Sequence, residues 1–116
     1  MNCTIGIDIG TTSTIGILLN TKNHKVIFQS SRPVKLYSQK SGWAEQEPDV
    51  WWQNTVSILS DIGKYSKKKN IKIMSIGVTG MLPALVLLDK QNEIIRRSIQ
   101  QSDSRTELEL KSIFNT

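Results

Sequence analysis

The stretch that decides the fold is Thr4-Ile5-Gly6-Ile7-Asp8-Ile9-Gly10-Thr11-Thr12-Ser13, which is followed by the β-rich run 14–19. Isoleucine alternates with glycine or a polar residue over 4–9, and this is the pattern of a half-buried strand. The turn-forming residues 10–13 interrupt the pattern before the second β-rich run begins. We therefore expect two adjacent strands joined by a tight turn.

The residues that follow extend this pair into a layered α/β architecture. A third β-rich run spans about 25–31 and ends at Pro33, so the first three strands are predicted to form an antiparallel meander. From Pro48 the apolar residues recur at spacings of three and four, which predicts a helix that closes at a lysine-rich end and Asn70. A fourth strand is predicted over 71–78, with its isoleucines Ile71, Ile73 and Ile76 in the core.

The remaining pattern is weaker. Residues 34–47 are polar and irregular. The apolar run 84–88 precedes the turn residues 89–92, which predicts a hairpin with 93–96 as its second arm. A last helix is expected over 103–114.

Composition limits the class of protein. The 116 residues include 15 Lys and Arg against 10 Asp and Glu, a net charge of +5, and this length predicts one small domain with one core. The single Cys3 excludes an internal disulfide. Because no apolar run reaches about 18 residues and the N-terminus lacks a secretory pattern, we expect a cytoplasmic location and no membrane partner. The lysine cluster over 64–69 complements the end of a helix, so we expect no nucleic-acid partner.

The first turn has the chemistry of a phosphate site. Asp8 ends a strand and supplies carboxylate oxygens suited to Mg²⁺. Gly10 lets a ligand approach the backbone, and the hydroxyls of Thr11, Thr12 and Ser13 with nearby N–H groups suit phosphate oxygens. No Gly-Lys-Ser/Thr follows, which separates this turn from a Walker loop. The alternative interpretation is an ordinary tight hairpin with an aspartate at a strand end.

Four collinear motifs resemble the FGGY carbohydrate kinases, most closely their xylulokinase-like members, within the actin, Hsp70 and hexokinase ATPase superfamily. The first is Asp8–Ser13, which resembles the first phosphate motif of that superfamily. The second is Trp43–Trp52, with its Glu-Gln-Glu-Pro and Trp-Trp pairs. The third joins Gly77–Gly80 to Ala84–Asp89, and the fourth is Ser98–Arg105. Together they cover essentially the whole chain.

This resemblance implies a ribonuclease-H-like, actin-like ATPase domain with a mixed sheet, and a phosphotransferase that uses ATP and Mg²⁺ on an alcohol group of a sugar or polyol. It implies that Asp8 serves the metal and that Gly10, Thr11, Thr12 and Ser13 face the ATP phosphates. The residues that it places near the sugar are Met81, Leu82, Gln101 and Asp103. Phosphoryl transfer depends on in-line positioning and charge neutralisation, which a loop with a metal can supply.

The resemblance also concerns length, because relatives are several-fold longer. Residues 1–116 are therefore expected to be the N-terminal part of the first kinase domain, with the rest of that domain and the whole second domain absent. The catalytic base, an aspartate, is expected beyond Thr116, so the chain alone should be inactive. An incomplete sheet would expose an unpaired edge and apolar surface, through which we expect self-association.

Departures from the family pattern leave the substrate open. Pro83 stands where many xylulokinases have the histidine of Gln-Met-His-Gly, and Gln101 and Ser102 replace the usual Trp-Asn pair. Hydroxyl recognition depends on such polar groups, so a ketose, an aldose or a polyol each fits.

Two other functions compete with a kinase. One is a non-catalytic nucleotide-binding or interaction module with the same fold. The other is a ribonuclease-H-type nuclease, which the absence of acidic residues over 71–78 disfavours.

Trp43 is the tryptophan best suited to a functional, solvated position, whereas Glu45 and Glu47 are assigned to loop structure and the helix start.

Overall fold

The computed structural model describes all 116 residues, and their contacts divide the chain into two compact units. The first unit comprises Met1–Val34 and Asp49–Met81, and the second comprises Lys35–Pro48 and Leu82–Thr116. The single core expected from the length is the one apolar cluster that the structure forms. The buried apolar cluster belongs entirely to the first unit.

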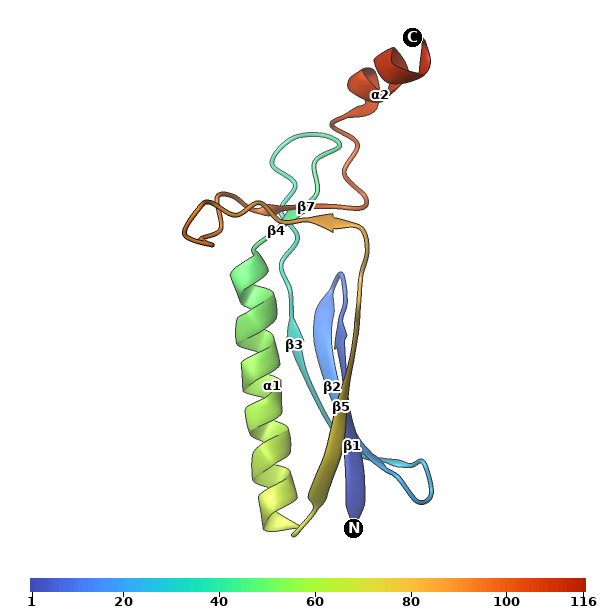
Figure 1. Cartoon of the computed structure of the whole chain (residues 1–116), viewed down its shortest axis with the longest axis vertical. Coiled ribbons are helices and arrows are strands. Elements are labelled where there is room, and N and C mark those ends of the chain that lie inside the picture. Colours follow the sequence, from blue (N-terminus) through green and yellow to red (C-terminus); the bar gives the residue numbers. More distant parts are fainter. The chain divides into compact units, whose positions relative to one another are not determined.

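The first unit contains a four-stranded mixed sheet with the strand order β3-β2-β1-β5 (Figure 1). Its strands are β1 (Asn2–Ile9), β2 (Ser13–Asn20), β3 (Val26–Pro33) and β5 (Lys72–Gly80). The first three form the predicted antiparallel meander, and β5 lies parallel to β1. The expected α/β class with a mixed sheet is therefore confirmed.

Helix α1 (Pro48–Lys68) runs along one face of this sheet (Figure 1). Ile58 and Ile62 are fully buried from the helix side, and they form one cluster with the sheet residues Cys3, Ile5, Ile7 and Leu18. The alternation predicted for β1, and the alternating burial that β2 also shows, therefore place one set of side chains under the helix.

The predicted helix end is confirmed at Asn70. Its φ of 53° places it in the left-handed region, which commonly closes a helix. The N–H of Ile71 then donates to the carbonyl of Ser66 at 2.9 Å, which satisfies a carbonyl of the last turn.

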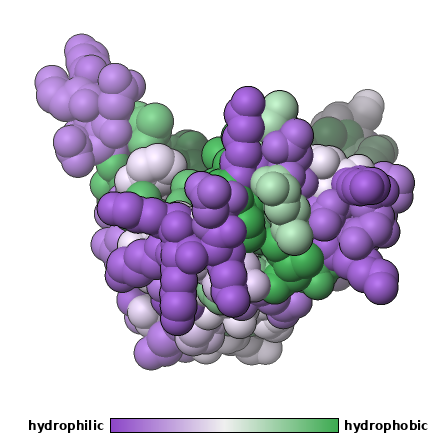
Figure 2. Space-filling model, turned by 90° about the horizontal axis from the view of Figure 1, so that it is seen from below, coloured by the Kyte–Doolittle hydropathy of each residue, from purple (hydrophilic) through white to green (hydrophobic).

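The burial predicted for the fourth strand is wrong for Ile73 and Ile76, whereas Ile71 packs against the core cluster as predicted. Every residue of β5 is exposed, including Ile73 at 37% and Ile76 at 55%, and Ile71 just before it is half-buried. Ile76 lies in register with the buried Ile5, but α1 packs over β1 and β2 and leaves the neighbouring edge strand open. Figure 2 shows green apolar side chains that reach the surface between purple hydrophilic ones.

The second unit contains a small sheet with the order β4-β7-β6, formed by β4 (Glu45–Gln46), β7 (Ser98–Gln100) and β6 (Ala84–Leu85). The predicted hairpin is confirmed around its turn, where the N–H of Asp89 donates to the carbonyl of Glu93 at 2.9 Å, the N–H of Ile95 donates to that of Leu87 at 3.0 Å, and an antiparallel bridge joins Leu88 to Ile94. The start of its first arm differs from the prediction, because β6 pairs with β7. Strand β4 falls in the segment predicted to be irregular. It is too short and too polar to show alternation.

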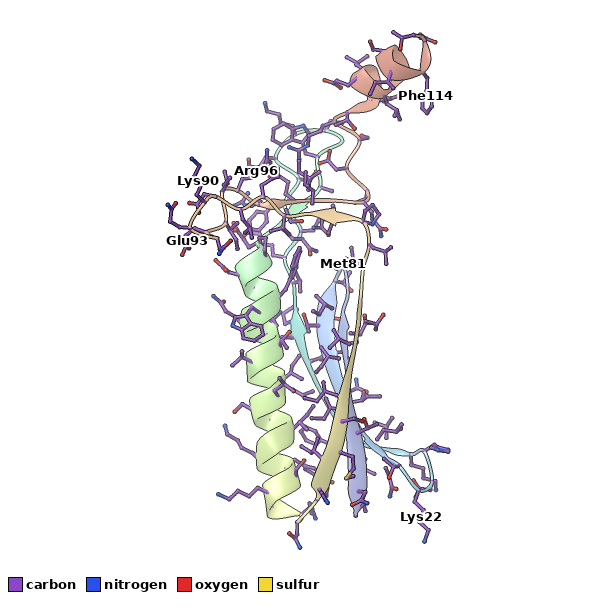
Figure 3. The ribbon with its side chains drawn as sticks, in the orientation of Figure 1. Lys22, Met81, Lys90, Glu93, Arg96 and Phe114 are labelled. Carbon is purple, nitrogen blue, oxygen red and sulfur yellow. The ribbon has the colours of Figure 1, made fainter.

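Helix α2 (Glu107–Phe114) begins later than predicted, because the turns over 101–106 engage the backbone first. It has no buried residues, and Phe114 is 79% exposed (Figure 3). Neither helix of the structure is long and apolar enough to cross a membrane.

Candidate functional site

The loop between β1 and β2 is held by two backbone hydrogen bonds. The N–H of Gly10 donates to the carbonyl of Ser13 at 2.9 Å, which closes the turn on itself. The N–H of Val34 donates to the carbonyl of Thr12 at 2.9 Å, which ties the loop to the chain after β3. The loop therefore has a fixed backbone path, as a phosphate-binding turn requires.

Asp8 precedes this loop with an exposed side chain and pairs in register with Ile15 on β2 and Thr79 on β5. No cluster of three acidic, histidine or cysteine side chains that could hold a metal exists in the structure. Mg²⁺ commonly binds through one or two carboxylates together with water and substrate phosphates. An exposed carboxylate beside a turn rich in hydroxyl groups fits that mode.

Gly10 is the residue that the loop geometry requires. A Cβ at this position would lie 2.9 Å from the carbonyl oxygen of Ser13 and 3.8 Å from Oδ2 of Asp8. Real Cβ atoms do not approach a backbone oxygen so closely, so a side chain here would open the turn. The space beside Asp8 is therefore kept free by the absence of a side chain.

Met81 is brought to the same end of the sheet as the loop. Its N–H donates to the carbonyl of Ile9 at 2.9 Å, directly before Gly10 (Figure 3). The structure thus gathers Asp8, the loop 10–13 and Met81 within the first unit.

An apolar hollow of about 410 Å³ lies over β1, β2 and β5 in the same unit. Asp8 and Thr79 are its polar lining residues, and the paired glycines Gly6 and Gly77 contribute part of its floor. Sequence analysis does not predict this hollow, because its lining comes from three strands whose register is set by the fold.

In the second unit, Gln101 lies at the tip of a turn that runs from Gln100 to Asp103. The N–H of Asp103 donates to the carbonyl of Gln100 at 3.0 Å, so Gln101 and Ser102 are the two central residues, and both are exposed. Ala44 holds both ends of this turn. It accepts from the N–H of Gln100 at 2.9 Å and donates its own N–H to Oδ2 of Asp103 at 2.7 Å.

Asp103 is enclosed by Arg105, and only 2% of its side chain is exposed. The Oδ1 atom accepts from the backbone N–H of Arg105 at 3.0 Å and from its Nε at 2.8 Å. The Oδ2 atom accepts from Nη2 of Arg105 at 2.6 Å. These guanidinium hydrogen bonds hold the pKa of Asp103 well below its ordinary value, and the N–H of Ala44 lowers it further against the opposing effect of burial.

Arg105 also reaches two other side chains. Its Nη2 donates to Oε2 of Glu45 at 2.8 Å, and its guanidinium carbon lies 3.9 Å from the centre of the Trp43 ring. Arg96 donates to the same Glu45 oxygen. Hydrogen bonds to Asp103 and Glu45 raise the pKa of Arg105 above its ordinary value. The Trp43 side chain is half-buried, and Nζ of Lys40 also lies over its ring, 4.7 Å from the ring centre.

The remaining predicted residues have simpler surroundings. Leu82 is 77% exposed and is the first residue of the segment Leu82–Thr116 of the second unit. Glu45 lies on β4, and Glu47 forms an ion pair with Arg97 at 2.7 Å just before α1. Sequence analysis missed Arg105, although the spacing Asp103-Ser104-Arg105 was a signal for a local ion pair.

Comparison with known proteins shows the family to which the chain belongs. The family model described as "FGGY family of carbohydrate kinases, N-terminal domain" matches residues 3–115. The xylulose kinase of Bacillus subtilis (strain 168) is 36% identical over 106 residues, which cover 91% of this chain and 21% of the relative.

Solved structures give the same result. The xylulose kinase from Rhodospirillum rubrum superposes with a TM-score of 0.91 at 42% identity, over 97% of this chain and 23% of that one. The gluconate kinase from Lactobacillus acidophilus superposes with a TM-score of 0.87 at 27% identity, and the match covers 98% of this chain and 22% of that one. The chain spans about a fifth of the length of the curated relatives that it matches. The fold is the actin-like ATPase fold that the resemblance implied, and the chain belongs to the FGGY family of carbohydrate kinases.

Proposed function

We propose that this chain supplies the first phosphate loop and part of the polyol-recognising surface of an ATP-dependent carbohydrate kinase. The observation that supports it best is the turn at Gly10, where a Cβ would lie 2.9 Å from the carbonyl oxygen of Ser13 and 3.8 Å from Oδ2 of Asp8. Family membership supports the reaction class, since the relatives named above are xylulose and gluconate kinases.

In this proposal the loop residues Gly10, Thr11, Thr12 and Ser13 bind phosphate oxygens of ATP, and Asp8 holds Mg²⁺ together with those oxygens. The metal would neutralise charge on the phosphates, which is what phosphoryl transfer chiefly needs. The chain's own contribution is a preformed turn that orients the phosphates without reorganising. We assign no catalytic base to residues 1–116 and expect no turnover from this chain alone.

The polyol side of the proposal involves Met81 in the first unit, and Leu82, Gln101 and Asp103 in the second. Gln101 offers an amide, which can both donate to and accept from a hydroxyl. Because Pro83 and Ser102 depart from the family pattern, we propose a polyhydroxy substrate without choosing among ketose, aldose and polyol.

The organisation that we propose is that residues 1–116 form the N-terminal part of the first kinase domain. We further propose that the exposed edge strand β5 lets two copies associate. Its whole length is exposed, with Met74 and Val78 at 52% and 68%.

Isothermal calorimetry of the 116-residue chain with ATP and Mg²⁺ tests the phosphate site. We expect saturable binding that weakens without Mg²⁺ and disappears in Asp8→Asn. The matched control is Asp49→Asn, an exposed aspartate in the first turn of α1, which should bind like the wild type. A folded wild-type chain that binds no nucleotide, or equal loss in both variants, contradicts the proposal.

A further inference from the structure

Asp103 has no acceptor capacity left for a substrate hydroxyl. An ionised carboxylate offers about four lone-pair sites. Oδ1 accepts from the N–H and Nε of Arg105, and Oδ2 accepts from Nη2 of Arg105 and the N–H of Ala44. All four sites are filled at 2.6–3.0 Å, and the side chain is 2% exposed. A polyol could bind this carboxylate only by displacing one of these donors.

The same contacts determine where Gln101 lies. Ala44 holds Gln100 through its carbonyl and Asp103 through its N–H, so both ends of the turn are fixed to one residue. Gln101 and Ser102 lie between these two anchors, and both are exposed. The carboxylate of Asp103 therefore acts on the shape of the turn.

Arg105 is suited to this role in a way that lysine is not. Its planar guanidinium makes two bonds to Asp103 and one to Glu45 while lying 3.9 Å from the centre of the Trp43 ring. A lysine ammonium is a single point charge that cannot fill this fork or stack in the same way. With 14% of its side chain exposed, Arg105 is also partly shielded from competing water.

We propose that Asp103 and Arg105 are positioning residues that hold the turn 100–103, and that Gln101 with Ser102 is the part of the turn that meets the polyol. This inference rests on the proposed carbohydrate kinase function. It changes the role of Asp103, which the family resemblance places near the sugar, from ligand to support. It also makes the neutral Gln101 amide the specificity-determining group of this turn.

Nuclear magnetic resonance of the labelled 116-residue chain tests the positioning role. We compare the wild type with Arg105→Gln and Arg105→Lys. The matched control is Arg97→Gln, because Arg97 also pairs with a glutamate and lies over a ring, that of Tyr37 at 3.5 Å, without touching the turn. The readouts are the pH titration of the Asp103 carboxyl carbon and the order parameters of the Gln101 and Ser102 amides.

In the wild type we expect Asp103 to titrate well below the ordinary range, and the two amides to have order parameters of about 0.85. In Arg105→Gln the titration should move up toward the ordinary value and the order parameters should fall below about 0.6. Arg105→Lys should restore the titration in part, and Arg97→Gln should change neither. An ordinary titration in the wild type overturns the proposal, and this result needs no variant to fold. Unchanged order at Gln101 in a folded Arg105→Gln overturns it as well.

Addition of D-xylulose, D-xylose and xylitol in turn, which are a ketose, an aldose and a polyol, tests the assignment of Gln101. We expect its side-chain amide signals to shift in the wild type and not in Arg105→Gln, while the Asp103 carboxyl carbon stays unchanged. A shift at Asp103 without one at Gln101 overturns the proposal, as does a Gln101 whose amide signals none of the three probes shifts. Because Mg²⁺–ATP binding depends on Asp8 in the other unit, failure here is distinguishable from failure of the proposed function.

Discussion

Gly16 on β2 lies so close beneath Ile58 of α1 that a Cβ on Gly16 would lie 2.2 Å from the Cγ2 atom of Ile58. Cδ1 of Ile62 and Cδ1 of Ile7 would lie at 3.2 and 3.1 Å. The helix therefore packs directly on the backbone of β2, and the core of the first unit depends on this position having no side chain.

Gly16→Ala should destabilise the first unit by about 1–3 kcal/mol, the usual cost of overpacking a core. The control is Gly77→Ala on β5, where a Cβ meets nothing within 4 Å. Urea unfolding followed by circular dichroism gives both free energies of unfolding. We expect the control to stay within about 0.5 kcal/mol of the wild type. Equal effects of the two substitutions would show that α1 does not pack as described.

Strand β1 and helix α1 could be predicted because each carries a regular period over six residues or more, and β2 and β3 because they are β-rich runs bounded by turn residues. The isoleucines of β1 alternate, and the apolar residues from Trp51 to Tyr65 recur at helical spacing. A buried face imposes such a period, so the period identifies the element.

The second unit could not be predicted in this way. Its strands β4 and β7 have two and three residues, and their buried side chains include Gln46, Ser98 and Gln100. Such strands are defined by pairing partners distant in sequence. The burial of β5 failed for the opposite reason: its apolar residues are typical of a core strand, but whether a helix covers them depends on the tertiary structure.

The candidate site also has one part that could be predicted from the sequence and one part that could not. The turn at Gly10 was predictable because its chemistry is contiguous in the sequence. The environment of Asp103 was not, since Ala44 binds its carboxylate and Glu45 binds the neighbouring Arg105 from about 60 residues away in the sequence.

Gly10→Ala should weaken Mg²⁺–ATP binding by about tenfold or more, which corresponds to roughly 1.4 kcal/mol. The added methyl would meet the Ser13 carbonyl oxygen that the N–H of Gly10 binds, and the turn must open to admit it. Gly63→Ala on α1 is the control, because a Cβ there contacts nothing within 4 Å. Calorimetry with both variants checks the prediction, and an unchanged affinity in Gly10→Ala would argue that phosphate does not approach this backbone.

The stability of the second unit should fall in acid because of Asp103. Its pKa is lowered in the folded state by the guanidinium of Arg105, so the stabilisation is complete above the unfolded pKa of about 3.9. It is lost as the pH falls through the folded value. Asp103→Asn should therefore cost about 1.5–3 kcal/mol at pH 7 and progressively less toward pH 2.

Trp43 fluorescence can follow that unfolding in a chain where Trp51 and Trp52 are replaced by phenylalanine. The stability of the wild type and of Asp103→Asn in urea should converge as the pH falls from 5 to 2. Asp89→Asn is the control, since Asp89 accepts only backbone N–H groups in an exposed turn. A constant difference across this pH range would mean that Arg105 does not hold the carboxylate in its charged form.

Self-association through β5 should be visible in sedimentation equilibrium. An edge strand with exposed apolar side chains is a template for pairing with a second chain, and a lysine on such a strand blocks that pairing. The apparent mass of the wild type should therefore rise above 13.1 kDa with concentration, and Val78→Lys should restore the monomer mass. Val56→Lys is the matched control, because Val56 is 47% exposed on α1, away from the sheet edge. If both lysine variants dissociate the protein equally, general charge repulsion and not the β5 edge governs the association.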